Sequence, residues 1–448
     1  MARLGARWLA LRDSLWFLPA LITVAAAGLA WITVEMDSRM SAAARAGVTL
    51  AFGGGVEGAR GVLDAISGTM ITVTSVVFSL TFVALQLASS QFTPRVLRNF
   101  TGDRANQAVL GVFIGTFTYS LLVLRTIRSA VDDGTSFVPS ISVGVAIGLA
   151  LVSIGFLIFY IHHTARTIQA SVIIDRTTAE TNTLVRRLFP QTIGEPDAEP
   201  LAAPVPVESP AVVTAEHAGY LQAVDSDTLF DRAVEGRLTV RMEPAVGDFV
   251  LPGAALASVW PAGAAGDEVV DGIRSAFVLG LERTLQQDVE FGIRQLADIA
   301  IKALSPGIND PTTATICIDR LAEVLVNLGT RHAPERARRD DEGRVRFLAR
   351  ETTFVGAVDL AFDQIRHYGV GDAHVVAHLL ETLGRIAELV PSALRPALIG
   401  QASSLLESAR ESVRVPRDLA RVEWAAAWTA PGGLMMAGPP QQTGGGPR

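Results

Sequence analysis

The hydrophobic pattern of the first 165 residues predicts four membrane-spanning helices. Four apolar stretches in this region approach or exceed the roughly 20 residues that cross a hydrocarbon layer about 30 Å thick. They run over residues 14–34, 68–90, 106–127 and 139–161. Residues 1–165 are therefore expected to form an α-helical transmembrane domain with four spans.

The first stretch has an alternative interpretation as a cleaved signal peptide, because arginines precede its apolar run. It is longer than a usual secretory core, however. Trp8, Trp16 and Trp31 lie near its two ends, and tryptophan is enriched at membrane interfaces. We therefore expect the stretch to be retained as a membrane anchor, whereas cleavage would leave three spans.

Arginine placement predicts the orientation of the spans. Arginines are concentrated before the first span, between the second and third, and after the fourth, at Arg3, Arg7, Arg12, Arg95, Arg98, Arg104, Arg166, Arg176, Arg186 and Arg187. By the positive-inside rule these three segments face the cytoplasm. The sequence thus predicts a multi-pass membrane protein with both termini in the cytoplasm.

Beyond the fourth span the pattern changes three times. Residues 166–190 are predicted to form a connecting helix with a basic last turn, and residues 191–210 an extended linker rich in proline and acidic residues. Residues 211–265 alternate with a period of two, which predicts a small β unit. Its segment VGDFVLPGAAL resembles strands of lipoyl-like barrels, so we expect a barrel-like unit. Lys302 is the only lysine of the chain, so the unit has none to carry a prosthetic group.

From residue 271 to 425 the apolar positions recur with a helical period. The helical stretches are 271–304, 311–329, 344–367 and 371–412. Long helices joined by short turns predict a helical bundle packed on the β unit. Residues 429–448 carry too little apolar content to fold, and we expect a disordered tail there. The predicted fold class is a four-span membrane domain followed by a soluble α+β region.

Composition agrees with a membrane protein and argues against several other classes. The 448 residues are 49% hydrophobic and 19% charged, which is too apolar for a typical soluble protein. The formal net charge of -7 comes without a basic patch, so no nucleic-acid partner is expected. Cys317 is the single cysteine, which leaves no intrachain disulfide or thiolate zinc site, and its apolar surroundings predict a buried thiol.

Polar side chains follow one face of the second predicted span. A helix places Thr72, Ser75, Ser79 and Gln86 on the same side. Bonds back to the helix backbone, or interhelical bonds of about 0.6 kcal/mol on average, explain the hydroxyl groups. Gln86 is harder to explain, because its amide has more hydrogen-bonding sites and must face protein or water. These residues are therefore candidates for either pore lining or helix packing.

The segment ALSPGINDPTTA, residues 303–314, predicts a sharp connection between two helices. Pro306 and Gly307 end the first helix, and Asp310 followed by Pro311 starts the next. The amides of that helix N-terminus could also bind an anion, although the Asp310 carboxylate competes for them. A structural connector and a ligand or interface site both remain open, the candidate residues being Ser305, Asn309, Asp310 and Thr312.

Residues that carry conventional chemistry are sparse. His374 and His378 are four apart but lack an HExxH-type carboxylate pattern, and His162 and His163 lie where the fourth span ends, as interfacial histidines do. The sequence has no P-loop, Rossmann glycine motif or nucleophile elbow. We therefore expect no catalytic residues, no metal and no cofactor.

Two long segments resemble the signature segments of a known family. They are FSLTFVALQLASSQFTPRVLRNF, residues 78–100, and FGIRQLADIAIKALSPGINDPTTA, residues 291–314. Both are similar to the predicted bacterial membrane proteins called domain of unknown function 2254, and the resemblance extends to about residue 425. It implies a protein of the bacterial inner membrane with a soluble C-terminal region and no established activity. It assigns no catalytic residue.

Two functional hypotheses follow. In the first, the chain is a homo-oligomeric channel or pore lined by the second span, with a cytoplasmic regulatory domain. Four spans leave little room for a water-filled path within a single chain, so the pore would lie on the axis of an oligomer. In the second, it is a membrane-anchored sensor or scaffold whose cytoplasmic domain binds a small solute, an ion or a protein partner. Proton-coupled transport is disfavoured, because no charged residue lies in the central part of any span.

Overall fold

A computed structural model of the chain describes residues 16–40, 52–91, 103–128, 137–167, 169–189, 208–331, 337–350 and 352–430. The chain divides into two compact units, the membrane unit (residues 3–169) and the C-terminal unit (residues 170–448). Most of the predicted linker 191–210 and of the predicted tail 429–448 lies outside the described residues.

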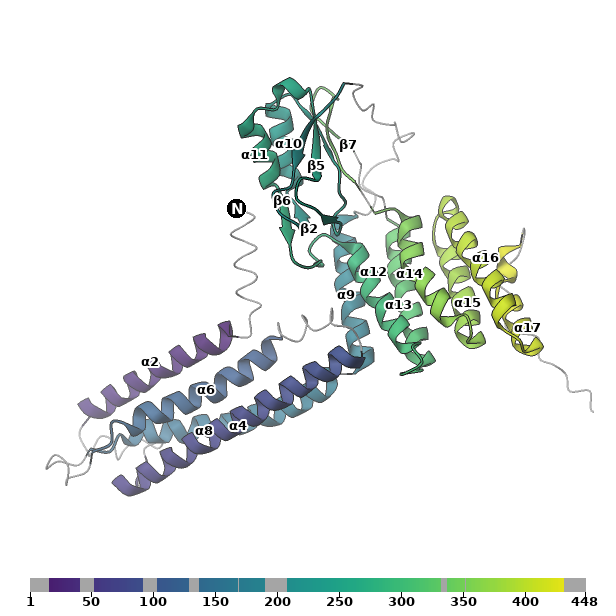
Figure 1. The fold of residues 1–448 in the computed structure, drawn as a ribbon. Helices are drawn as coiled ribbons and strands as arrows, with labels where there is room; N and C mark the ends of the chain where they lie inside the picture. Colours follow the sequence, from purple (N-terminus) through teal and green to yellow (C-terminus); the bar gives the residue numbers. More distant parts are fainter. Residues whose placement is uncertain are drawn as a thin grey trace, which may run out of the picture. The chain divides into compact units, whose positions relative to one another are not determined.

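The membrane unit consists of long helices that lie side by side (Figure 1). They are α2 (Phe17–Arg39), α4 (Val56–Gln91), α6 (Arg104–Leu124) and α8 (Ser140–Thr167). All four are long and apolar enough to cross a membrane, so the structure has four candidate spans in the region where the sequence predicts four. Helix α6 contacts each of the other three and is the most deeply buried, so it forms the centre of the unit.

Helix α4 begins at Val56 and not at residue 68, where the apolar stretch starts. The part of α4 before residue 68 contains the charged residues Glu57, Arg60 and Asp64, so the apolar pattern alone does not reveal it. The 36 residues of α4 extend about 54 Å, well beyond a hydrocarbon layer of about 30 Å. The helix therefore continues past the membrane-spanning part at one or both ends.

Hydrogen-bonded hydroxyl groups join the helices inside the membrane unit. The pairs are Thr33 with Tyr119 at 2.8 Å, Thr81 with Tyr160 at 2.6 Å, and Thr116 with Ser153 at 3.1 Å. In lipid a polar group has to find its partner within the protein. These pairs therefore act as cross-links between helices, each contributing about 0.6 kcal/mol on average.

A buried carboxylate closes one end of the membrane unit. Asp37, near the end of α2, has no exposed surface and accepts hydrogen bonds from the amides of Ile141 (3.1 Å) and Ser142 (2.9 Å) and from the Ser142 hydroxyl (2.7 Å). The first amides of a helix have no partner within that helix. Asp37 thus caps α8 from a neighbouring helix.

Asp103 and His163 close the opposite end of the membrane unit. Asp103 caps α6 by accepting a bond from the Ala105 amide at 2.9 Å, and its second oxygen lies 2.7 Å from Nε2 of His163. The His163 ring also stacks on Phe159. His163, expected only as an interfacial residue, therefore joins the end of α8 to the start of α6.

The C-terminal unit begins with α9 (Ala170–Leu188), which corresponds to the predicted connecting helix 166–190. Helix α9 packs on α12 (Val289–Ala303) and α13 (Pro311–Gly329). At the contact with α12, a Cβ on Gly292 would collide with the side chain of Thr181. A glycine at 292 is therefore needed for the close packing of α9 on α12. Asn182 and Asn327 hold α9 to α13 through a side-chain hydrogen bond of 2.9 Å.

The β unit contains two sheets. One has the order β1-β5-β3-β8-β7 and the other the order β4-β2-β6. The strands are β1 (Ala211–Thr214), β2 (Gly219–Val224), β3 (Thr239–Met242), β4 (Phe249–Val250), β5 (Ala255–Trp260), β6 (Phe277–Gly280), β7 (Ala337–Arg339) and β8 (Val345–Leu348). Neither sheet closes on itself, so the expected barrel-like unit is not found, and its place is taken by two open sheets.

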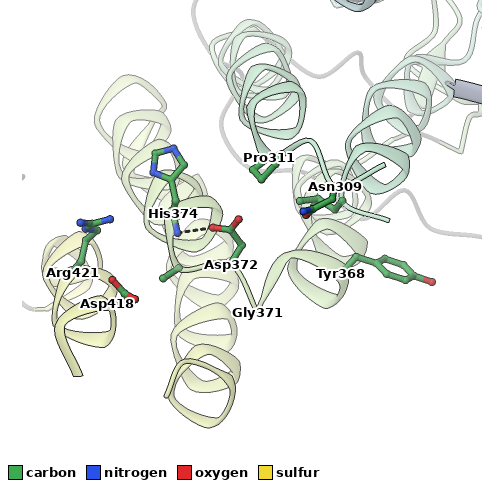
Figure 2. A pocket seen from close by; sticks show the side chains of 10 residues that line it. Asn309, Pro311, Tyr368, Gly371, Asp372, His374, Asp418 and Arg421 are labelled. Atoms are coloured by element: carbon green, nitrogen blue, oxygen red, sulfur yellow. Dashed lines mark hydrogen bonds between the residues drawn. The ribbon is translucent and has the colours of Figure 1, made fainter. Parts of the chain in front are cut away.

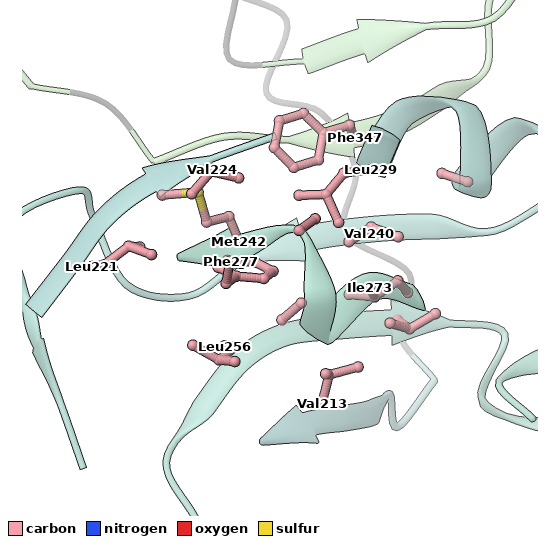
Figure 3. Packing of buried hydrophobic residues seen from close by; sticks show 14 of the residues in the cluster. Val213, Leu221, Val224, Leu229, Val240, Met242, Leu256, Ile273, Phe277 and Phe347 are labelled. Carbon is pink, nitrogen blue, oxygen red and sulfur yellow. The ribbon is translucent and has the colours of Figure 1, made fainter. Parts of the chain in front are cut away.

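One apolar core fills the β unit (Figure 3). Helices α10 (Ser226–Glu235) and α11 (Asp267–Ser275) contribute Leu229 and Ile273 to it, and both side chains are fully buried. Strand β8 contributes Phe347, which is opposite Val240 of β3 in the single parallel pairing of the described sheets. Residues 345–348, within the helix predicted for 344–367, are therefore a strand that completes this core.

The remaining helices form the bundle. They are α12, α13, α14 (Phe354–Gly369), α15 (Ala373–Leu389), α16 (Arg395–Ser412) and α17 (Pro416–Ala425). Helix α13 spans the predicted residues 311–329, whereas the predicted helix 371–412 is interrupted near Pro391, which cannot continue a helix. Cys317 is fully buried in α13, and burial raises the pKa of its thiol, so it is a structural residue.

Paired charges lie at the start of α12. Arg283 donates to both carboxylate oxygens of Asp288 at 2.7 and 2.8 Å, and the Asp288 side chain is only 2% exposed. Asp288 also caps α12 through the Phe291 amide at 2.9 Å. Gly247, at a φ of 98°, makes room for this carboxylate, since a Cβ there would collide with it. Burial, together with the charge of Asp288, raises the pKa of neighbouring Glu290.

Candidate functional site

The polar residues predicted on the second span point away from the other helices of the membrane unit. Thr72, Ser75, Ser79 and Gln86 are all exposed, whereas the opposite side of α4 is buried through Met70, Val77 and Ala84. The hydroxyls of Thr72 and Ser75 donate to the carbonyls of Gly68 and Ile71, each at 2.9 Å. The four candidates therefore share one face, and no other described helix of the unit covers it.

Glycines and acidic residues continue this face toward the start of α4. We call the exposed positions, spaced mostly three or four residues apart, the outward face: Glu57, Gly61, Asp64, Gly68, Thr72, Ser75, Ser79 and Gln86. Phe82 and Val83 fill the gap before Gln86. A Cβ built on Gly61 or Gly68 would meet nothing within 4 Å. Among the described residues no ion pair joins Glu57 or Asp64, and the exposed positions of this face are polar residues or glycines except at Phe82 and Val83.

Gln86 lies near one end of the membrane unit. Helices α4 and α8 run in the same direction, and Thr81 is bonded to Tyr160, about one turn before His163. Gln86 is a further rise of about 7.5 Å along α4. Gln86 therefore lies at about the same position along the helix axes as the Asp103–His163 pair. The middle of the outward face is formed by Thr72, Ser75 and Ser79.

The loop between α12 and α13 has the sharp geometry that its sequence predicts. Asp310 caps α13 by accepting bonds from the hydroxyl of Thr313 and from its amide at 3.1 Å, and these bonds lower the pKa of the carboxyl. Asn309 adopts a φ of 50°, in the left-handed region. The Ser305 hydroxyl donates to the carbonyl of Lys302 at 2.7 Å. Asp310 thus occupies the position that an external anion would take.

A cavity of about 540 Å³ lies beside this loop (Figure 2). It is lined by Leu304, Asn309, Pro311, Tyr368, Gly371, Asp372, Ala373, His374, Asp418 and Arg421. These residues come from the α12–α13 loop, the α14–α15 loop and α17, which are far apart in the sequence. Of the four predicted loop residues only Asn309 lines the cavity, while Ser305, Asp310 and Thr312 do not.

His374 and His378 of the bundle have different surroundings. Nε2 of His378 lies 2.9 Å from an oxygen of Asp319, while His374 lines the cavity. Across the part of the chain that the structure describes, no three His, Cys, Asp or Glu residues gather as metal ligands would. The cavity is therefore the candidate site of this unit.

Comparison with known proteins places the chain in a family. The family model for a predicted membrane protein, DUF2254, matches residues 12–385, which include the outward face and Asn309 but not Asp418 or Arg421. Uncharacterized proteins of Mycobacterium bovis and Mycobacterium tuberculosis are each 38% identical over 383 residues, covering 84% of this chain and 73% of the relative. No solved structure matches the chain. The chain belongs to the DUF2254 family of predicted membrane proteins.

Proposed function

We propose that the protein is a homo-oligomeric channel in which the outward faces of α4 from several copies line a shared polar path. The exposure of that face is the observation that carries the proposal. The hydroxyls of Thr72 and Ser75 have bonds to their own helix backbone, but a bilayer offers no further partner to them and none to the Gln86 amide. A second copy or an enclosed column of water offers such partners. Proteins keep such residues within membranes mainly along substrate or ion pathways.

The spacing of the outward face suits contact between identical helices. Two sets of its residues recur every seven positions, namely Gly61, Gly68 and Ser75, and Thr72, Ser79 and Gln86. A seven-residue period keeps one seam facing a partner helix at a crossing angle of about 20°. Small side chains on such a seam let the helices approach closely.

The chemistry of the face favours cations. Asp64 and Glu57 would form rings of carboxylates at the Val56 end of the path, and such rings select cations. The hydroxyl groups of Thr72, Ser75 and Ser79 would line its middle. With both termini in the cytoplasm of a bacterium, as the arginine distribution favours, the acidic end faces outward and the C-terminal unit lies on the cytoplasmic side as a regulatory domain.

Cysteine cross-linking tests self-association through this face. In a Cys317→Ala background, Ser79→Cys is expected to give strong disulfide-linked dimers in membranes, because Ser79 lies in the middle of the proposed contact. Phe78→Cys and Leu80→Cys are matched controls, since both side chains are exposed but point to either side of the face. Equal dimer yields at all three positions would indicate random collision and reject the contact.

Flux measurements test the path itself. Reconstituted vesicles are expected to conduct small cations, and Ser79→Leu is expected to abolish the flux by closing the middle of the path with an apolar side chain. Asp64→Asn should lower the preference for cations over anions, while Leu80→Ile should leave flux unchanged. Vesicles that contain cross-linkable oligomers and yet pass no ion would rule out the channel.

A second candidate function is favoured by the cavity of the C-terminal unit. A cavity lined by charged groups suits a membrane-anchored sensor that binds a solute and passes the signal to the membrane unit or to a partner. Binding of a solute to the full chain, with slower amide hydrogen exchange in the loops around residues 304–310 and 369–372, would support this function. Unchanged exchange with every solute would count against it.

A further inference from the structure

The cavity beside the α12–α13 loop presents charges of both signs. We infer that it binds a small zwitterion, a free amino acid being the simplest example, with an ammonium and a carboxylate group on one molecule. This inference rests on the second candidate function, solute sensing by the C-terminal unit. The volume of about 540 Å³ is within the range of small-molecule sites, roughly 300–1,000 Å³.

Two carboxylates in the wall provide a site for the ammonium group. One oxygen of Asp372 accepts the amides of His374 (2.9 Å) and Val375 (3.2 Å), and its other oxygen has no hydrogen-bond partner among the described residues. Asp418, on α17, takes part in no ion pair within the same described ranges. Their negative charge therefore remains available to a bound cation.

Arg421 provides the site for the carboxylate group. It is exposed on α17, one turn after Asp418, and no ion pair in the described part of the chain engages its guanidinium group. Arginine binds carboxylates through two parallel N–H bonds. The side-chain amide of Asn309, held by a left-handed backbone, can donate to or accept from either end of a ligand.

The arrangement disfavours ligands of a single sign. A phosphate or dicarboxylate would be repelled by the two aspartates of the wall. The helix N-termini that would otherwise attract it are already capped by Asp310 and Asp372. A diamine would be repelled by the positive charge of Arg421. A zwitterion places each of its groups next to the opposite charge, which satisfies all three charged side chains at once.

Binding to the full chain in lipid nanodiscs, measured by equilibrium dialysis, tests the inference. The probes are the common amino acids, succinate as a dicarboxylate and putrescine as a diamine. At least one amino acid is expected to bind, and succinate and putrescine are expected to bind much more weakly. Arg421→Leu and Asp372→Asn should each weaken amino-acid binding by about tenfold or more, the usual effect of losing a hydrogen bond to a charged group.

The variants are chosen to separate binding from folding. Asn caps helices as well as Asp does, so Asp372→Asn removes the charge while keeping the start of α15. Arg417→Leu is the matched control, because Arg417 is exposed on the same helix and does not line the cavity. An equal loss of binding in Arg417→Leu would overturn the site. Tight binding of succinate or putrescine would overturn the ligand class but keep solute sensing, whereas no binding by any probe would overturn both.

Discussion

Replacing Arg283 with leucine is expected to destabilise the C-terminal unit by about 3–5 kcal/mol, because it leaves a buried carboxylate without its partner. Among the described residues Asp288 then keeps only its bond from the Phe291 amide, and its side chain is 2% exposed in the native structure. The measurement is guanidinium unfolding of the full chain in detergent, followed by hydrogen exchange at the amides of α12.

Arg344→Leu is the control for this variant. Arg344 pairs with Glu342, but the two side chains are 64% and 66% exposed, and exposed pairs contribute about 0–1 kcal/mol. If Arg283→Leu unfolds at the same denaturant concentration as Arg344→Leu, the pair at the start of α12 does not stabilise the unit.

Replacing Asp37 with alanine is expected to destabilise the membrane unit by roughly 2–5 kcal/mol, since three hydrogen bonds to one charged group are lost. The amides of Ile141 and Ser142 would be left buried without an acceptor at the start of α8. Unfolding in mixed micelles with increasing SDS, followed by tryptophan fluorescence, measures the change.

Two further substitutions sharpen this measurement. Asp37→Asn retains one acceptor oxygen and should fall between the native protein and Asp37→Ala. Glu35→Ala is the control, because Glu35 pairs with Arg39 at the surface, where the two side chains are 43% and 78% exposed. A midpoint for Asp37→Ala that matches Glu35→Ala would show that the α2 carboxylate does not hold α8.

Local signals in the sequence predicted the parts of the fold that depend on neighbouring residues. Long apolar runs indicate spans because the length of a run and the hydrophobicity of its own residues determine whether it can cross the lipid. The start of α13 was predicted because Asp310 and Pro311 act within one turn. Strand β8 was not, because four residues are too short to give a clear pattern and their partner is β3, about a hundred residues earlier.

The candidate sites show the same limit. The spacing of Thr72, Ser75 and Ser79 indicates that they share a side of α4, but only the packing of the unit shows that this side is uncovered. Asp418 and Arg421 carry no local signature of a site, since three separate segments have to meet before the cavity exists. The buried pair of Arg283 and Asp288 has no local signature either, because Arg283 lies before the helix that Asp288 caps.

The parallel pairing of β3 with β8 makes the β unit discontinuous in the sequence. Strands β1 to β6 end at Gly280, yet the sheet takes its last two strands from residues 337–348, after α12 and α13. A fragment ending at Gly280 would leave one edge of β3 unpaired and the core without Phe347, and unpaired edges promote aggregation. The sheets and the first two bundle helices are thus interleaved along one chain. They are therefore expected to fold as a single piece.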